Sequence, residues 1–322
     1  MVPARSSSYA LGLVLAAAAC FIFNAGVSRV VLRAGVDPAV LTTIRVTGAT
    51  LVFAGWAAAA RRSALRPPRG RHLAVVVLLG VVGVAGIQWT YFVAIDRLPV
   101  GLALLLQFTG PILVAVYARL VRHEHVRPRA WAGLVVATVG LGLVARVWEG
   151  LAFDGLGVLA GFGAAVCFAT YFLVAETGVR TEDPLAVVFW SFAVATLTMN
   201  VVQPLTGVDV DVIGSSVSML GALDGWVVAV WLLLAWVVVV GTVTPFALEL
   251  HALQLLPATT VVGLAMLEPV GVNVLGWAWF GERLDAVQLV GAAGVVVAIG
   301  LAQTARTARR PAPVPEPAPA PA

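Results

Sequence analysis

Charged residues are scarce in this sequence, and lysine is absent. Only 11% of the 322 residues are charged, whereas 61% are hydrophobic and the mean hydropathy is +0.99. A soluble domain has about 25% charged residues, so this composition excludes a soluble fold. Stretches of about 20 uncharged residues recur along the chain, and that length is enough for a helix to cross a bilayer.

Cysteines are few, and the common catalytic motifs are missing. Cys20 and Cys167 each lie in the middle of an apolar stretch, where a thiol packs as a small apolar group, so we expect neither a disulfide nor a metal site. The sequence has no HExxH, no CxxC and no glycine-rich phosphate loop before a lysine. We therefore predict no enzyme, no cofactor and no bound metal.

Ten apolar windows account for most of the chain. Each is long enough for a membrane helix, although the fifth is short, and none alternates polar and apolar residues as a barrel strand does. The predicted fold class is an all-α polytopic membrane protein with ten transmembrane helices. The first window could also be a cleaved signal peptide, but it continues past Cys20 to spanning length. The windows are 9–28, 38–60, 73–95, 99–118, 130–146, 155–175, 184–204, 226–248, 258–280 and 286–303.

Arginine is distributed unevenly between alternate loops. If the N-terminus is cytoplasmic, fourteen arginines lie inside, five lie outside, and Arg45 lies within a window. Positive residues favour cytoplasmic loops, so both termini are predicted to be cytoplasmic, in a plasma or inner membrane. The net charge of +4 and the pI near 9.7 then reflect topology, and no nucleic-acid partner is expected.

The chain contains an internal repeat. An offset of 158 residues pairs Gly83 with Gly241 and Pro111 with Pro269, and the offset shortens to about 147 further upstream. The predicted units are a first repeat at 9–147, a second repeat at 154–303 and a tail at 304–322. The tail is rich in arginine and then in proline and alanine, so we expect it to be disordered and cytoplasmic.

The two repeats are predicted to have opposite orientations in the membrane. Five helices are an odd number, so the second copy must enter from the other side. Charge supports this, because the arginine-rich stretch 61–71 corresponds to 205–225, which has three aspartates and no arginine. Two inverted five-helix repeats are typical of secondary transporters, which bind their substrate where the repeats meet, although a purely structural duplication stays open.

Two matched prolines indicate the candidate transport cavity. Gly110-Pro111 and Glu268-Pro269 interrupt the fourth and ninth windows, and a proline removes a backbone hydrogen bond from a helix. Gln107, Thr109 and Glu268 are the polar side chains nearby. A carboxylate at this depth faces a cavity or a partner, and Arg45 is the expected partner of Glu268, either for transport or as a structural ion pair.

Four further residues are candidates for the cavity wall. Asn24 and Tyr171 occupy matched positions and could both form hydrogen bonds with a ligand, while Trp89 and Tyr91 could supply aromatic surface or anchor the membrane interface. Glu249 and His251 are expected to reach water at a helix end. Glu124 and Glu282 are expected to cap loops after the two proline-bearing helices.

Two segments carry a resemblance to a known family. The segments RLPVGLALLLQFTGPILVAVYARLVRHEHV and LPATTVVGLAMLEPVGVNVLGWAWFGERL resemble the EamA family of the drug/metabolite transporter superfamily, and the TPFALELHALQLLP segment is similar to its threonine/homoserine exporter branch. The resemblance implies ten helices, two inverted EamA repeats, cytoplasmic termini and efflux of a small metabolite. That branch has a glutamate at the position of Gln107, so this chain lacks one candidate proton site.

The function predicted from these features is export of a small metabolite, an amino acid or related zwitterion, by alternating access. The expected partners are a small-molecule substrate and the lipid bilayer, while protons as coupling ion and a homodimer stay open. A multidrug exporter of aromatic cations with the same fold is the alternative function. A non-transporting scaffold and a channel are further alternatives.

Overall fold

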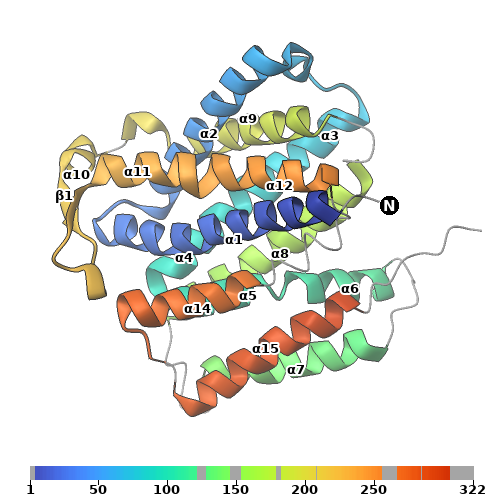
Figure 1. Cartoon of the computed structure of the whole chain (residues 1–322), viewed down its shortest axis with the longest axis vertical. Helices are drawn as coiled ribbons and strands as arrows, with labels where there is room; N and C mark the ends of the chain where they lie inside the picture. The colour runs from blue at the N-terminus through green and yellow to red at the C-terminus, as the bar shows by residue number, and fades with distance from the viewer. Residues whose placement is uncertain are drawn as a thin grey trace, which may run out of the picture.

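The protein is a bundle of helices that run side by side, most of them along a common direction (Figure 1). The computed structural model describes residues 4–121, 128–145, 154–178, 183–207, 209–255, 267–283 and 285–304. Residues 305–322 of the predicted tail, Glu124 and the LPATTVVGLAM segment at 256–266 lie outside the described residues.

The long elements follow the predicted apolar windows. Those of the first half are α1 (Ala4–Arg33), α2 (Pro38–Ala60), α3 (Arg71–Leu78), the π-helix η2 (Leu79–Gly86), α4 (Ile87–Arg97), α5 (Val100–Gln107), α6 (Gly110–Leu120) and α7 (Pro128–Ala145). Those of the second half are α8 (Gly155–Gly178), α9 (Pro184–Val202), α11 (Val230–Val238), the π-helix η6 (Val239–Val243), α12 (Thr244–Leu255), α14 (Leu267–Phe280) and α15 (Ala286–Thr304).

Among the described residues, five helical segments are long and apolar enough to cross a membrane. They are Ser8–Arg33, Pro38–Ala60, Arg71–Arg97, Pro184–Val202 and Val230–Glu249. Shorter apolar helices cover Gly155–Tyr171, Val270–Phe280 and Ala286–Ala298. The chain is therefore a multi-pass helical membrane protein, as its composition predicts.

Two matched aspartates start the second helix of each half. Asp37 Oδ1 accepts a hydrogen bond from the Ala39 N–H at 2.7 Å, and Asp183 Oδ1 accepts one from the Leu185 N–H at 3.1 Å. In each case a proline follows the aspartate and occupies the first helical position. An aspartate N-cap satisfies one of the free N–H groups, and proline has no N–H to lose there. The same local chemistry thus fixes both helix starts.

Helices from the two halves pack against one another rather than only within their own half. α2 lies along α9, α1 lies along α12 and α14, α8 lies along α4, α5 and α6, and α7 pairs with α15 at one edge of the bundle (Figure 1). Thr50 and Thr196, which are equivalent at an offset of 146, join α2 to α9 through hydroxyls 2.9 Å apart. The core is therefore built from both halves together.

Close helix contacts recur at equivalent positions. A Cβ added to Gly48 would lie 2.8 Å from Val238, and one added to Gly80 would lie 2.6 Å from Val194. Position 48 is equivalent to 194, and position 80 is equivalent to 238. The same pair of positions therefore meets twice, and in each contact the first half supplies the glycine and the second half the valine. Glycine permits this close approach because it has no side chain.

The π-helical segments η2 and η6 also occupy equivalent positions. Gly83 of η2 packs against the Tyr171 ring, and Gly241 of η6 packs against the Asn24 side chain. Tyr171 and Asn24 are themselves equivalent at the 147-residue offset. π-Helical turns are rare and are often found at functional sites, so this matched pair draws attention to the centre of the bundle.

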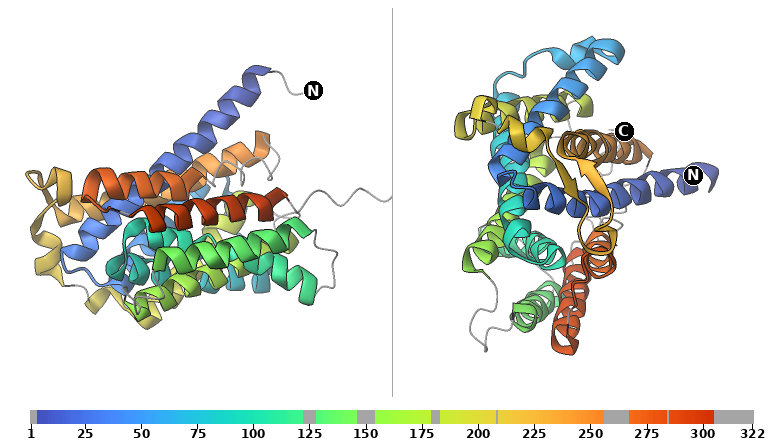
Figure 2. Two further views of the ribbon diagram at one scale, coloured as in Figure 1. Left: turned by 90° about the horizontal axis from the view of Figure 1, so that it is seen from below. Right: turned by 90° about the vertical axis from the view of Figure 1, so that its left-hand side faces the viewer.

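One end of the bundle carries a small hairpin that the all-α prediction did not include. β1 (Ser216–Ser218) pairs antiparallel with β2 (Val227–Ala229), between α10 (Val210–Gly214) and α11. Figure 2, at right, looks onto this end with the hairpin in front. The hairpin is anchored to α14, because the Trp279 Nε1–H donates to the Met219 carbonyl at 2.9 Å. The connection between α9 and α11 is thus folded, with short helices and a two-stranded sheet.

Candidate functional site

The break predicted near Pro111 is present. α5 ends at Gln107, α6 begins at Gly110, and Phe108 and Thr109 form the turn between them. The Thr109 hydroxyl donates to the Leu106 carbonyl at 2.6 Å, so it closes the turn locally. Pro269 is the third residue of α14, but residues 256–266 before that helix lie outside the described part of the chain. The side chains of both prolines also lie outside it.

Two predicted cavity residues carry buried polar atoms with no protein partner. Among the described residues, Gln107 Oε1 and the Tyr91 hydroxyl have no hydrogen-bond partner, and the same holds for Gln88 Oε1 and Ser191 Oγ. Leaving such an atom unpaired costs about 1–3 kcal/mol, so native proteins seldom do so without a ligand or water. Gln88 and Tyr91 are three residues apart and share one face of α4. Sequence reasoning missed Gln88 and Ser191, which lack any distinguishing motif.

Trp89 and Tyr91 do not form a single aromatic wall. Tyr91 is buried, whereas Trp89 is 37% exposed. Two residues that are two positions apart in an α-helix lie about 200° apart around its axis, so their side chains leave α4 on nearly opposite sides. Only Tyr91 belongs to the interior site.

Arg45 is buried as predicted, but its partner is not Glu268. The Arg45 Nε–H donates to the Thr242 hydroxyl, and Arg45 Nη2 donates to the Gly241 carbonyl at 2.9 Å. Its guanidinium also lies 5.4 Å from the centre of the Phe92 ring. Within the described chain no ion pair joins Arg45 to Glu268. The reason is the π-helical turn η6, which presents a carbonyl and a hydroxyl to α2 and so satisfies the arginine.

The predicted hydrogen-bonding residues Asn24 and Tyr171 both contact the opposite half. Asn24 is buried against Gly241 and accepts a long hydrogen bond, 3.5 Å, from Ser28 Oγ. Tyr171 is half-buried against Gly83. These contacts make both residues part of the packing between halves, in addition to any contact with a ligand.

Two carboxylates lie close enough to interact in the interior. Glu268 at the start of α14 interacts electrostatically with Glu249 of α12, and Glu249 also interacts with Tyr171. Tyr91 interacts electrostatically with both Glu268 and Arg45, so it links the carboxylates to the buried arginine. Glu249 was expected to reach water at a helix end; in the structure it is half-buried, and His251, two residues further on, is exposed.

This arrangement suits a small polar ligand. Glu249 and Glu268 are both half-buried. Like charges that interact disfavour each other, and an ammonium group or a proton bound to them would relieve the repulsion. Gln107 and Tyr91 are buried and carry unpaired polar atoms. The residues are therefore able to bind a ligand that carries a positive charge and hydrogen-bonding groups.

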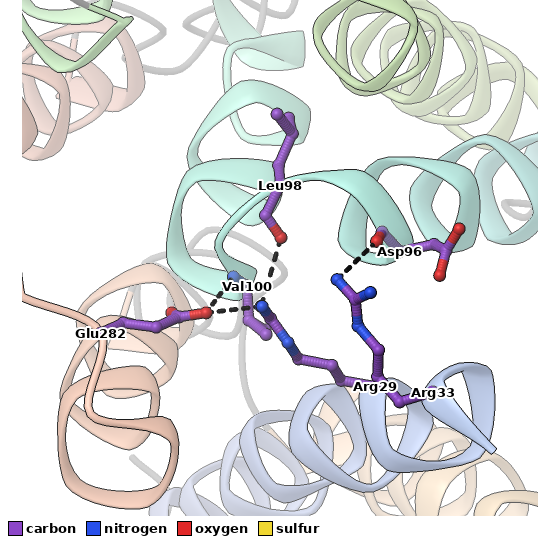
Figure 3. A network of polar contacts seen from close by, with 6 residues as sticks. All are labelled: Arg29, Arg33, Asp96, Leu98, Val100 and Glu282. Carbon is purple, nitrogen blue, oxygen red and sulfur yellow. Dashed lines mark hydrogen bonds and ion pairs between the residues drawn. The ribbon is translucent and has the colours of Figure 1, made fainter. Parts of the chain in front are cut away.

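A second polar cluster closes the end of the bundle near the hairpin (Figure 3). Arg29 Nη1 forms an ion pair with Glu282 Oε1 and donates to the Leu98 carbonyl at 3.2 Å. The Val100 N–H, the first of α5, donates to the same Glu282 oxygen at 3.3 Å. Arg33 Nη2 donates to the Asp96 carbonyl at 3.0 Å. Glu282 was expected to cap the loop after its own helix; instead it accepts from the start of α5, 182 residues away, and pairs with Arg29, which no local motif indicates.

This end cluster connects three segments that are distant in sequence. The Arg29 side chain of α1 also lies over the Phe280 ring, 5.2 Å from its centre, so α1, the turn before α5 and the end of α14 are held together. Burial raises the pKa of Glu282, and the Arg29 guanidinium offsets part of that rise. The cluster is thus a partly buried polar network at one end of the bundle.

Comparison with known proteins gives consistent matches. The model of the EamA-like transporter family matches residues 8–146 and 155–304. The threonine/homoserine exporter RhtA of Escherichia coli (strain K12) is 27% identical over 225 residues, which are 69% of this chain and 68% of that exporter. The exporter of the same name from Salmonella typhimurium (strain LT2) is 26% identical over 231 residues, 71% of each chain.

More distant proteins match over similar lengths. The uncharacterized transporter YdfC of Bacillus subtilis is 23% identical over 240 residues, 74% of each chain. One solved crystal structure superposes with a TM-score of 0.59 at 19% identity and covers 94% of this chain and 99% of its own. That structural match supports the fold alone.

Proposed function

The chain belongs to the EamA-like transporter family, and we propose that it is a secondary active transporter that exports an amino acid or a related zwitterion. The observation that carries this proposal is the interior polar site. It includes Glu249 and Glu268, which interact electrostatically, and buried side chains whose polar atoms have no described partner. The similarity to exporters that are named for threonine and homoserine supports an amino acid as the first substrate class to test.

The proposed binding mode assigns one part of the zwitterion to each side of the site. Glu268 and Glu249 bind the ammonium group, because a buried carboxylate needs a positive partner. The carboxylate binds to the Tyr91 hydroxyl and to Arg45. Arg45 uses the guanidinium N–H groups that do not bind Thr242 and Gly241. Gln107 and Thr109 lie at the helix break and form the polar wall.

Alternating access would use two inverted five-helix repeats, 9–147 and 154–303, that span the membrane ten times. The matched caps at Asp37 and Asp183 support this arrangement, as do the matched π-helical turns and the twice-made glycine–valine contact. The two ranges of the family match begin and end within one residue of the proposed repeats. Both termini are proposed to be cytoplasmic, on the basis of the arginine distribution.

In this arrangement the Arg29–Glu282 cluster seals the outer end of the transport path. It joins α1 to α5 and to the end of α14, and these helices also border the interior site. Opening that end requires the ion pair to break. The bound solute then leaves on the side opposite the termini.

Counterflow in proteoliposomes tests the substrate class. Wild-type protein loaded with unlabelled threonine should accumulate labelled threonine, and Glu268→Gln should lower the rate by about tenfold or more because a charge-assisted contact is lost. Trp89→Phe is the matched control, since Trp89 lies on the other side of α4, and it should stay within about twofold of wild type. Exchange of aromatic cations with no exchange of any amino acid would refute the proposal.

The pH dependence of the same assay tests proton coupling. If Glu268 binds the coupling proton, Glu268→Gln should remove the pH dependence of the exchange rate that the wild-type protein shows. A Glu268→Gln variant that exchanges threonine with an unchanged pH profile would show that Glu268 does not couple protons to transport.

A further inference from the structure

A cavity of about 520 Å³ lies far from the interior site, at the end of the bundle where α2 ends and α3 and α9 begin. It is bordered by the arginine-rich loop 61–70 on one side and by the first turns of α9 on the other. The Trp190 Nε1–H donates to the Arg66 carbonyl at 3.0 Å, so the loop is fixed against α9. The cavity is therefore formed by the folded chain itself.

The charge at the mouth of this cavity is positive. Arg66 and Arg69 line it, and within the described residues neither forms an ion pair. Among the described residues, Asp183 is the one carboxylate in its lining, and it is already engaged on both oxygens. Its Oδ2 accepts from Arg61 at 3.1 Å and its Oδ1 caps α9. Two guanidinium groups are thus left to bind an external anion.

The start of α3 adds to this positive potential. Gly70, at a φ of +57°, turns the chain into the helix, and no side chain caps the first N–H groups of α3. Free N–H groups at a helix start attract anions, phosphate groups above all. The helix start thus adds positive potential, although less than the two arginines do.

The floor of the cavity is apolar. Val75, Val76 and Val187 line it below the arginines, and Trp190 borders it. α3 and α9 belong to membrane-spanning segments that begin at Arg71 and Pro184, so this floor continues into the apolar zone of the bilayer. Tryptophan beside such a boundary is typical of the level of lipid head groups. A fitting ligand therefore carries an anionic group joined to an apolar chain.

We propose that this cavity binds the phosphate head group of an anionic phospholipid, held by Arg66 and Arg69, with the acyl chains along the outside of α3 and α9. Clusters of arginine directly beside a membrane helix attract anionic lipids. Arginine binds phosphate with two parallel N–H groups, which gives geometry as well as charge. The site is separate from the interior carboxylates and does not depend on the solute that is transported.

Lipid binding to the purified full-length protein tests the proposal with a matched pair of variants. Arg66→Gln combined with Arg69→Gln removes the two cavity arginines, whereas Arg62→Gln combined with Arg71→Gln removes the same charge from neighbouring positions outside the cavity lining. Phosphatidylglycerol affinity should fall by about tenfold in the first variant and by less than about twofold in the second. An equal loss in both variants would mean general surface attraction and would overturn the site.

Competition distinguishes the source of the phosphate. Phosphatidylcholine, which has no net charge, should not displace phosphatidylglycerol, and inorganic phosphate should displace it only at far higher concentration. Displacement by inorganic phosphate at equal concentration would identify a free-anion site instead of a lipid site. Absence of phosphatidylglycerol binding in the wild-type protein would also refute the proposal. All of the arginines exchanged are exposed, so unchanged unfolding temperatures should show that the variants fold.

Discussion

The loop between α2 and α3 and the connection between α9 and α11 are equivalent in the two halves, yet they differ in charge and in structure. The first carries four arginines over residues 61–70 and no carboxylate, and it borders a cavity against α9. The second carries Asp209, Asp211 and Asp224, no arginine, and a hairpin packed on α14. The helices on either side of these loops keep matched contacts. Packing between halves thus constrains the helices, whereas the loops differ in charge and structure, and the proposed topology places them in different compartments.

The largest expected effect concerns the side of the membrane on which each loop lies. In a variant without Cys20 and Cys167, Arg66→Cys and Ser215→Cys should react with a membrane-impermeant maleimide from opposite sides. In intact cells position 215 should be labelled and position 66 should react only after permeabilisation. Labelling of both positions from one side would rule out the inverted arrangement.

A smaller effect is expected where the halves are alike, at the matched π-helical turns. A Cβ at Gly83 would lie 2.7 Å from the Tyr171 ring, and one at Gly241 would overlap the Asn24 side chain. Gly83→Ala and Gly241→Ala should each lower the free energy of unfolding by about 1–3 kcal/mol, because the helices are forced apart. Thermal unfolding in detergent measures this.

Two controls make that comparison sharper. Gly55→Ala, where no atom lies within 4 Å of the added Cβ, should be neutral or stabilising by about 0.5–1 kcal/mol. Asn24→Ala should restore most of the stability lost in Gly241→Ala and none of that lost in Gly83→Ala. Equal rescue of both glycine variants would mean that the two contacts are not separate.

A third comparison concerns two ion pairs that join the halves at the same end. The side chains of Arg29 and Glu282 are 16% and 17% exposed, whereas those of Arg97 and Asp154 are 39% and 40% exposed. Arg29→Gln should therefore cost about 1–3 kcal/mol, because it leaves a half-buried carboxylate without its cation. Arg97→Gln should cost less than about 1 kcal/mol. Equal unfolding temperatures of the two variants would contradict this ranking.

The smallest effect is a pH dependence at Asp154. The Gly157 N–H donates to Asp154 Oδ1 at 2.8 Å and lowers the pKa of this carboxyl, with a further contribution from Arg97. The stabilisation is present above the unfolded pKa of about 3.9 and is lost as the pH falls through the lower folded value. Asp154→Asn should therefore lose less stability than wild type on acidification below about pH 4. Identical acid-unfolding curves would contradict the assignment.

Much of the helical fold could be predicted because hydropathy alone decides which segments can lie in lipid. The five spanning segments coincide with predicted windows, and the break between Gln107 and Gly110 lies beside the predicted proline. The hairpin could not be predicted, because its two strands are three residues each and depend on contact with Trp279, more than 50 residues away. Local pattern carries no information on such a distant partner.

The interior site was predicted only in part, for a related reason. Gln107 and Glu268 could be proposed from the sequence because polar groups are rare in apolar windows, and Tyr91 because of its aromatic ring. Arg45 was assigned the wrong partner, since a carbonyl presented by a π-helical turn leaves no trace in side-chain chemistry. Glu249, which hydropathy places at the water boundary, is half-buried, because packing between helices covers part of its side chain.

The hydrogen bond between Thr50 and Thr196 has a mechanical consequence. Thr50 and Thr196 occupy equivalent positions, so the bond between them is unchanged if the two halves exchange conformations. The Gly83–Tyr171 and Gly241–Asn24 contacts would then take each other's form. A bond with that property does not have to break when the proposed repeats rock. In that proposed motion the contact between α2 and α9 stays in place, and the other helices tilt around Thr50 and Thr196.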